Sequence, residues 1–167
     1  MSPLFLVLEP VRELLVKLTK RVFFKATTDM KLALKEFSDL ISTSLDLEII
    51  TGSLINSVQS TIDCSEIYVL LKNSDSYKIR DASASSTDLS DINFALNHPI
   101  ITWFKEGNSS LFKNQINNHV LFKGMWKREK MVIQKMNTEI IFPIRYLDEL
   151  IGFVVVSERK DETPYSF

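Results

Sequence analysis

The sequence predicts an α+β domain: a central antiparallel sheet flanked by helices, with a helical extension at the N-terminus. Residues 10–62 carry apolar side chains at helical spacing, residues 66–82 form two strand-like segments, and residues 138–159 form a second, more apolar pair. Strands joined by short links pair antiparallel, and the helices then cover the sheet. With 167 residues, 45% hydrophobic and 25% charged, the chain has the size and composition of one folded domain.

Three helices are predicted before the first strand. Residues 10–26 have an apolar side and a side rich in Lys and Arg. That basic side has two interpretations: a solvated face of a packed helix, or a segment lying against anionic lipid headgroups. Residues 30–44 and 47–62 form the second and third helices. The inward-facing residues of the third helix are predicted to be Ile50, Leu54, Val58 and Ile62.

The first pair of strands follows the third helix. Residues 66–72 are rich in β-branched and aromatic side chains and are predicted to form a strand. The polar run 73–76 is predicted to be a turn, and residues 77–82 alternate as in a more exposed hairpin partner. The polar run 83–91 is predicted to be a loop.

The middle section is predicted to hold two helices and one short strand. Residues 100–106 indicate a short helix that Gly107 ends, and residues 110–112 a short strand. The Asn-rich run 114–118 is predicted to be a loop. Residues 120–135 are predicted to be one interrupted helix. The residues available for burial there are Val120, Leu121, Met125, Met131, Val132 and Met136.

The last pair of strands is the most clearly predicted structure in the sequence. Residues 140–144 and 151–156 are dominated by Val, Ile and Phe, and the polar link 147–149 lies between them. Pro143 cannot donate a hydrogen bond, so we expect the first arm to be paired on one side only there, or bulged. Gly152 predicts a close backbone approach or a bulge in the second arm.

Composition excludes several classes of function. The net charge of −1 gives no overall electrostatic footprint for nucleic acid, so we predict no nucleic-acid partner. The single cysteine, Cys64, excludes an intrachain disulfide and a multi-cysteine zinc site. No apolar run approaches the roughly 18 residues of a membrane helix, and no phosphate-binding glycine motif is present. We therefore expect a cytoplasmic domain, which an upstream segment of its parent protein could tether to the membrane.

Three stretches of the sequence resemble the GAF domain, a small sensory module of bacterial signalling proteins and cyclic-nucleotide phosphodiesterases. The family's leading helices and first strand resemble FSDLISTSLDLEIITGSLINSVQSTIDCSEIYVLL. Its middle helix and the strand after it resemble HPIITWFKEGNSSLF, and its closing hairpin resembles IIFPIRYLDELIGFVVVSER. Pro143 and Gly152 stand where the family commonly has Pro and Gly. Upstream, PVRELLVKLTKRVFFKATTDMKLALKEFS is similar to the segment joining membrane helices to a GAF domain in some sensor histidine kinases.

The resemblance implies an antiparallel sheet of about six strands with helices on both sides, a cavity on one face, and dimerisation through flanking helices. Residues 1–28 would be a linker helix and residues 29–167 the GAF-like domain. Contacts between two copies are predicted at Leu14, Leu18 and Phe37. The family's C-terminal helix is absent after the polar tail KDETPYS, so we expect the chain to be part of a longer protein. The expected parent is a sensor histidine kinase, with a diguanylate cyclase or a transcriptional regulator as the alternatives.

The ligand pocket, if the domain has one, is predicted in the aromatic and Met-rich middle section, because ligand pockets are mostly apolar. The candidate lining residues are Trp103, Phe104, Phe112, Phe122, Met125, Trp126 and Met131. The alternative, that these side chains fill the core, stays open. Members of the family bind cyclic nucleotides, haem, bilins, iron or small metabolites, and the motif of the cyclic-nucleotide binders is not found here.

The cysteine and the two histidines of the sequence do not indicate catalysis. Cys64 is interpreted as a small buried side chain, and it lies too early in the chain to carry a bilin. His98 and His119 are the only histidines and the only candidates for ligating haem iron, although His98 before Pro99 also fits the start of a helix. No nucleophile with a nearby base is recognisable, so we predict that the chain is not an enzyme and has no metal site.

Overall fold

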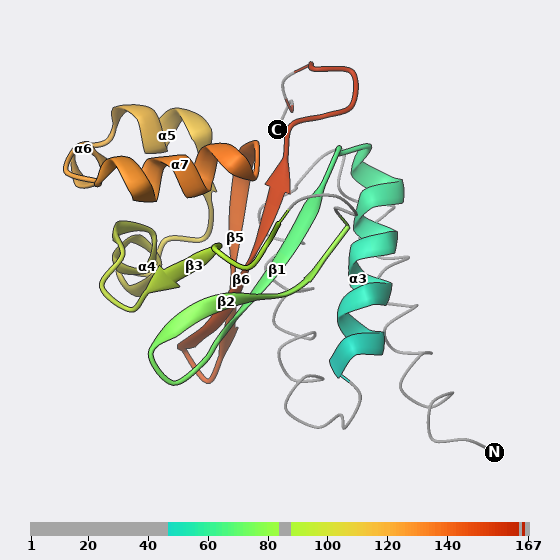
Figure 1. Cartoon of the computed structure of the whole chain (residues 1–167), viewed down its shortest axis with the longest axis horizontal. Helices are drawn as coiled ribbons and strands as arrows, with labels where there is room; N and C mark the ends of the chain where they lie inside the picture. The colour runs from blue at the N-terminus through green and yellow to red at the C-terminus, as the bar shows by residue number, and fades with distance from the viewer. Residues whose placement is uncertain (1–46, 84–87, 164, 166–167) are drawn as a thin grey trace.

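The computed structural model describes residues 47–83, 88–163 and 165 (Figure 1). The predicted helices at 10–26 and 30–44, the contacts predicted at Leu14, Leu18 and Phe37, and the predicted boundary after residue 28 lie outside these described residues. The elements are α3 Leu47–Ile62, β1 Ile67–Lys72, β2 Ser76–Ala82, β3 Asn93–Ala95, α4 Pro99–Lys105, β4 Leu111–Phe112, α5 Lys113–Asn118, α6 Val120–Lys123, α7 Lys127–Lys135, β5 Thr138–Tyr146 and β6 Glu149–Ser157.

The strands form a six-stranded sheet in the order β3-β2-β1-β6-β5-β4. Each pair of neighbouring strands is antiparallel. The predicted fold class, an α+β domain on an antiparallel sheet of about six strands, is therefore confirmed. The two predicted hairpins, β1–β2 and β5–β6, are joined side by side through β1 and β6, so the most apolar strands lie at the centre.

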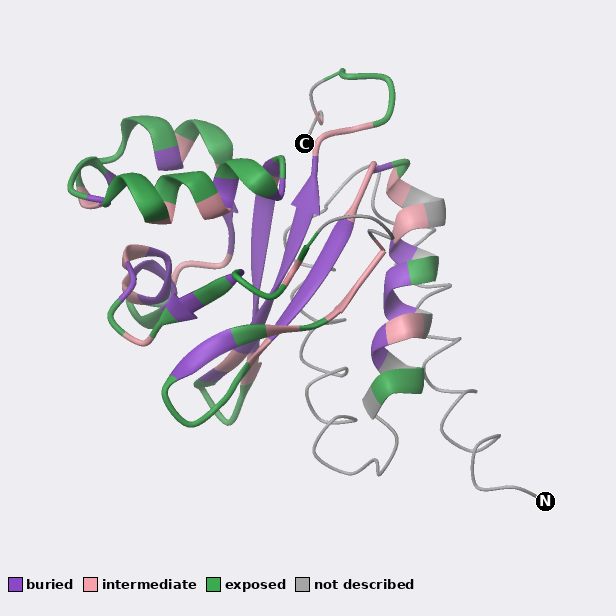
Figure 2. Cartoon of the chain, viewed as in Figure 1, coloured by how far each residue is buried: buried purple, intermediate pink, exposed green. Residues whose placement is uncertain are grey.

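Helices cover both faces of the sheet: α3 packs on one, and α4 to α7 lie on the other (Figure 1). Along β1, Ile67 and Val69 face the core under α3, whereas Tyr68 and Leu70 face the core on the side of α4 to α7. The central strands are accordingly buried along most of their length, as Figure 2 shows. This two-sided burial explains why β5 and β6 read as continuous apolar runs rather than as an alternating pattern.

The β5–β6 hairpin turns at Leu147 and Asp148, whose φ angles of 47° and 67° are both positive. Two positive φ angles are the signature of a type I′ turn, which matches the twist of the flanking strands. The turn is therefore one residue shorter than the predicted link 147–149, since β6 already begins at Glu149.

The structure confirms the bulge and close backbone approach predicted at Gly152 and the one-sided pairing predicted at Pro143. The β5–β6 register shifts after Ile144, which leaves Ile151 as an extra residue on β6 beside Gly152. A Cβ atom on Gly152 would lie 2.4 Å from the carbonyl oxygen of Leu70 on β1, so only glycine allows this backbone approach. Pro143 is paired with β6 alone, because β4 reaches only the earlier part of β5.

The middle section differs most from the prediction. The run 114–118 is wrong as a loop, because it lies within the helix α5, and the strand β3 was not predicted. Residues 120–135 form two helices, α6 and α7, separated by residues 124–126. The expected burial is right for Met125 and Met136 and wrong for Val120 and Met131, which are exposed.

Candidate functional site

The face of the sheet under α4 to α7 is filled at its centre by aromatic side chains. Phe153 of β6 lies with its ring centroid 5.4 Å from that of Phe94, 5.5 Å from that of Tyr77 and 6.4 Å from that of Phe104. All four rings are at most 1% exposed. Tyr77 also donates its hydroxyl to the carbonyl of Leu150 at 2.9 Å, which satisfies the one polar atom in the group.

Four of the predicted pocket residues belong to this same core: Trp103, Phe104, Phe122 and Met125. Trp103 is held by a 2.9 Å hydrogen bond from its indole nitrogen to the carbonyl of Ser110. Its ring lies 5.7 Å from that of Phe122, which ties α4 to α6. These four side chains of the middle section are thus gathered on one face of the sheet, where they belong to one packed core.

The other three predicted pocket residues lie elsewhere. Phe112 packs against the core on the α3 face, because it follows Leu111 on a strand and adjacent strand residues point to opposite faces. Trp126 and Met131 are 78% and 58% exposed. The structure therefore does not bring the seven candidates together, and a ligand in this section stays a prediction.

His98 is a buried polar side chain in the same core, and it is 3% exposed. Its Nδ1 accepts a hydrogen bond from the backbone N–H of Ile100 at 3.2 Å, which makes it the N-cap of α4. The helix-start role predicted from its position before Pro99 is confirmed. The ring also makes an edge contact with Phe94, with centroids 4.7 Å apart.

The second ring nitrogen of His98, Nε2, has no hydrogen-bond partner in the described residues. Because Nδ1 acts as an acceptor, the proton of the neutral ring is on Nε2. The nearest acidic oxygen is Oε1 of Glu129, 3.9 Å away, which is too far for a hydrogen bond. Burial lowers the pKa of His98 to about 4, so the ring is neutral near pH 7 and this contact is not an ion pair.

The sequence contains no signal for the contact between His98 and Glu129. His98 caps α4 and Glu129 is on α7, so only the tertiary fold, in which α7 packs on β5, places them together. The other carboxylate oxygen of Glu129 accepts from the backbone N–H of Trp126 at 2.7 Å, where it completes the capping box of α7.

His119 is exposed and caps α6 through a hydrogen bond from the backbone N–H of Leu121. Its ring lies against Trp103, with centroids 5.1 Å apart. Within residues 47–83, 88–163 and 165, no group of three His, Cys, Asp or Glu side chains is arranged to hold a metal ion. His98 and His119 thus act as helix caps, of α4 and α6 respectively.

Cys64 is buried on the α3 side of the sheet, and its interpretation as a small core residue is confirmed. Burial raises the pKa of the thiol to about 11, so the reactive thiolate is scarce at neutral pH. Cys64 also forms a backbone bridge with Arg159, just after β6.

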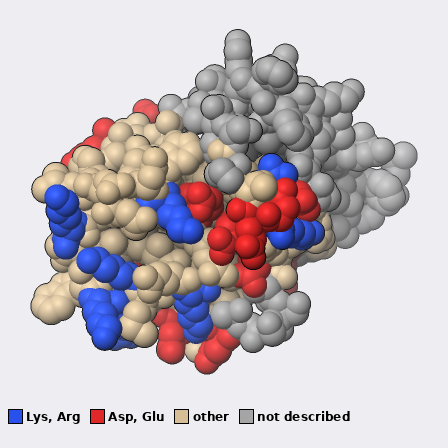
Figure 3. Space-filling view, turned by 90° about the horizontal axis from the view of Figure 1, so that it is seen from above, with Lys and Arg blue, Asp and Glu red and all other residues tan. Residues whose placement is uncertain are grey.

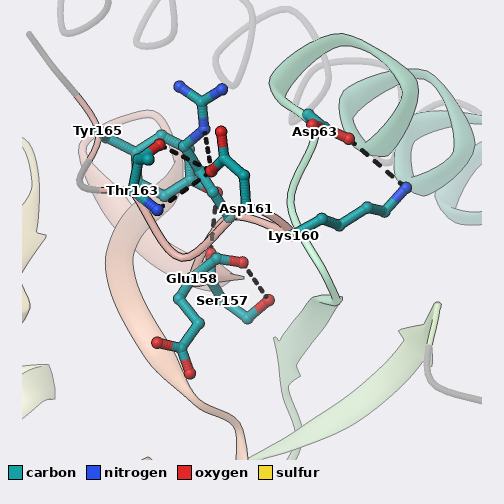
Figure 4. Close-up of polar contacts among 8 residues, drawn as sticks. Asp63, Ser157, Glu158, Lys160, Asp161, Thr163 and Tyr165 are labelled. Atoms are coloured by element: carbon teal, nitrogen blue, oxygen red, sulfur yellow. Dashed lines mark hydrogen bonds and ion pairs between the residues drawn. The ribbon is translucent and has the colours of Figure 1, made fainter.

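That bridge is part of a short junction between the end of α3 and the segment that leaves β6 (Figure 4). The backbone N–H of Ser65 donates to Glu158, and that of Lys160 donates to Asp63, both at 3.0 Å. The side chains of Lys160 and Asp63 add a 3.7 Å ion pair. The junction therefore extends the pairing of β1 with β6 beyond both strands.

In the part of the chain that the structure describes, no helix is both long and apolar enough to cross a membrane.

Comparison with known proteins gives structural matches only. No protein-family model and no curated protein matches the sequence. A methyl-accepting chemotaxis protein matches with a TM-score of 0.59 at 14% identity, over 78% of this chain and 83% of that one. The GAF domain/HD domain protein of Geobacter sulfurreducens matches at 0.55 and 12% identity, over 70% and 77% of the two chains.

A third match is a domain described as that of a two-component sensor histidine kinase from Sinorhizobium meliloti 1021. Its TM-score is 0.50 at 15% identity, over 74% of this chain and 78% of that one. Such low identities carry information on fold alone. The chain has the GAF fold, as the sequence predicts.

Proposed function

We propose that this GAF-fold chain is a non-catalytic sensory or regulatory domain of a bacterial signalling protein, and that the parent is a sensor histidine kinase. The observation that carries the proposal is the shared fold with domains described as parts of a chemotaxis protein and a sensor histidine kinase. The polar groups of the described residues support a regulatory role, since the two histidines cap helices and the one thiol is buried. A diguanylate cyclase or a transcriptional regulator remains the alternative parent, and no nucleic-acid partner is proposed.

The proposed mechanism is a change in helix packing that passes to the output domain of the parent. Helix α3 packs on β1 and β2, and its end is tied to the segment leaving β6. A rearrangement of the sheet or of α4 to α7 would therefore act on both the upstream helix and the downstream segment. Two copies would pair through upstream helices at Leu14, Leu18 and Phe37, and a signal would bias two packings of this pair.

Analytical ultracentrifugation of the 167-residue chain at micromolar concentration tests the pairing. We expect a dimer that Leu14→Asp converts to a monomer, because a charge replaces an apolar contact. The matched control is Leu147→Asp, which changes an 84% exposed residue at the hairpin turn and should leave the dimer intact. A chain that sediments as a monomer, unchanged by Leu14→Asp, contradicts the proposal.

A small-molecule ligand on the α4–α7 face is a second candidate function. The buried Nε2 of His98, which lacks a hydrogen-bond partner in the described residues, favours it, because such groups are usually satisfied. Haem, cyclic nucleotides and small metabolites are the ligand classes to test. A ligand at 100 times its dissociation constant would stabilise the fold by about 2.7 kcal/mol.

The two tryptophans make the location of such a ligand testable. In Trp126→Phe only Trp103 emits, from within the core, whereas in Trp103→Phe only the exposed Trp126 emits. A ligand buried beside Trp103 should change the emission of the first variant more than that of the second, whose Trp126 lies outside the core. Absence of both an emission change and a thermal shift with every candidate would favour a purely structural dimerisation module.

The domain is proposed to act in the cytoplasm, with an upstream segment of the parent as its tether to the membrane. The sequence on either side of the chain tests this directly. Upstream membrane helices and a downstream kinase domain are the expected result, and a catalytic cyclase or a DNA-binding domain would select one of the alternatives.

A further inference from the structure

Positive charge is concentrated on one part of this nearly neutral chain. Residues 113–135, which hold α5, α6 and α7, contain six basic side chains and one acidic one, a net charge of +5. Since the whole chain carries −1, the other residues together carry −6. Figure 3 shows Lys and Arg along the left-hand side of the molecule, the side of α6 and α7, and a cluster of Asp and Glu nearer the middle.

Two of these six cations have a partner among the described residues. Lys113 pairs with Glu139, and Lys135 donates to the carbonyl of Asp88. The other four are exposed and form no ion pair with any residue that the structure describes. These four are Lys123, Lys127, Arg128 and Lys130.

Large apolar side chains are exposed on the same segment. Val120 on α6, Trp126 between α6 and α7, and Met131 on α7 are 74%, 78% and 58% exposed. Single exposed apolar residues are common in folded proteins. Three of them within one short basic segment lie outside the core, and packing of the domain does not explain them.

Helix α7 presents both kinds of side chain outward. Ile133, and Met136 just after the helix, are buried against the domain, whereas the exposed Lys127 and Met131, four residues apart, lie on the opposite side of the helix. Lys130 is also exposed and lies on the flank between the two sides. The exposed stretch of α7 is visible at the edge of the molecule in Figure 2. Together with Val120, Lys123 and Trp126, these residues define the α6–α7 surface.

We propose that the α6–α7 surface docks on a lipid bilayer that contains anionic headgroups. Lysine side chains near such a surface are attracted by its negative potential, and Trp is suited to the boundary between headgroups and acyl chains. Val120 and Met131 would reach the same depth, while the rest of the domain stays in water. A protein partner fits less well, because lysine is depleted at the centre of protein–protein interfaces.

Vesicle sedimentation with the whole chain tests the proposal. We expect binding to phosphatidylcholine vesicles that contain phosphatidylglycerol, little binding to pure phosphatidylcholine, and weaker binding at high salt. The double variant Lys127→Gln/Lys130→Gln should lower the partition coefficient roughly 30-fold, because each cation contributes a factor of about five. In Trp103→Phe, the emission of Trp126 should shift to the blue when anionic vesicles are added.

The matched control is Lys17→Gln/Lys20→Gln, which removes the same charge from the basic segment 10–26. Thermal unfolding of each variant should match that of the parent chain, since Lys127 and Lys130 make no ion pair among the described residues. The proposal is overturned if only the control pair weakens binding, or if Trp126 emission does not move. It is equally overturned if the chain binds poly-L-glutamate or single-stranded DNA but not anionic vesicles.

Discussion

His98 shows how one buried side chain can make a small domain sensitive to acid. Its ring caps α4, fits against Phe94 and is kept from water, so protonation would place a buried charge 3.9 Å from the carboxylate of Glu129. The pKa of the folded state, about 4, is below the usual 6.5. The unfolded chain therefore takes up the proton first as the pH falls.

This shift predicts a loss of stability between pH 6.5 and pH 4. Over that window the unfolded state binds one more proton than the folded state, which lowers the free energy of unfolding by up to about 3 kcal/mol. Urea denaturation at a series of pH values measures it. His98→Asn keeps an acceptor for the N-cap but does not titrate, so its stability should fall less on acidification. The exposed His119→Asn should behave as the parent chain, and equal curves for all three would contradict the assignment.

Gly152 is a residue at which one methyl group should be costly. The Cβ atom of Gly152→Ala would meet the backbone of β1 at 2.4 Å, and a central strand cannot move away without losing its pairing. We expect a loss of about 2–3 kcal/mol in urea denaturation. The control is Gly124→Ala, since a Cβ there would meet nothing within 4 Å and its φ of −81° is ordinary. Equal stability of the two variants would rule out the clash.

At the scale of elements, periodicity and residue type predict the central structure well. Helix α3 has the predicted bounds, and the strands of both hairpins lie close to theirs, because long apolar patterns report burial directly. Helix α5 escapes prediction because its six residues KNQINN are polar and Asn-rich, and only Ile116 is buried. The three-residue strand β3 is too short to show alternation.

In the candidate site too, residues on long patterned elements are predicted better than residues on short ones. Residues that lie on a predicted helix, such as Trp103 and Phe104, are gathered in one core. Phe112 is misassigned because its face depends on the register of a two-residue strand, and Trp126 because it lies between two helices that the sequence joins. The contact of His98 with Glu129 arises from tertiary packing alone.

The turn of the β5–β6 hairpin holds two residues with side chains in a strained backbone conformation, so better-suited residues there should stabilise the domain. Leu147 and Asp148 have positive φ angles, which cost a residue with a side chain more than glycine or asparagine. The replacement Leu147→Asn/Asp148→Gly should raise the free energy of unfolding by about 1 kcal/mol. Ser74→Gly in the β1–β2 turn, where no positive φ occurs, should give no gain. A gain of the same size at both turns would point to a general effect of glycine.

At the scale of the molecule, the sheet separates two cores that share its central strands. The core under α3 holds Cys64, whose side chain is fully buried. Reagents can reach this thiol when α3 leaves the sheet, when the junction with residues 158–160 opens, or when the domain unfolds. The thiol therefore reports on opening at the α3 side of the sheet, the junction included.

We predict that Cys64 in the native protein reacts slowly with an aromatic disulfide reagent at pH 8. In the native state burial excludes the reagent and raises the pKa of the thiol to about 11, so the reaction proceeds from the open state. The rate should therefore rise with urea in proportion to the open fraction. Ser74→Cys in the exposed turn supplies a thiol that should react at once with the same reagent. Similar rates at the two positions would show that α3 or the junction that contains Cys64 is open in the native state.

The junction between α3 and the segment after β6 has a mechanical consequence. Asp63 to Ser65 and Glu158 to Lys160 run antiparallel, and both lead away from the same end of the sheet. A pull between the upstream and downstream segments would act first on α3, because α3 lies along the sheet between residue 47 and Asp63 (Figure 1). The junction should therefore stay closed for as long as α3 stays packed on β1 and β2, and it holds the two segments together at one end of the sheet.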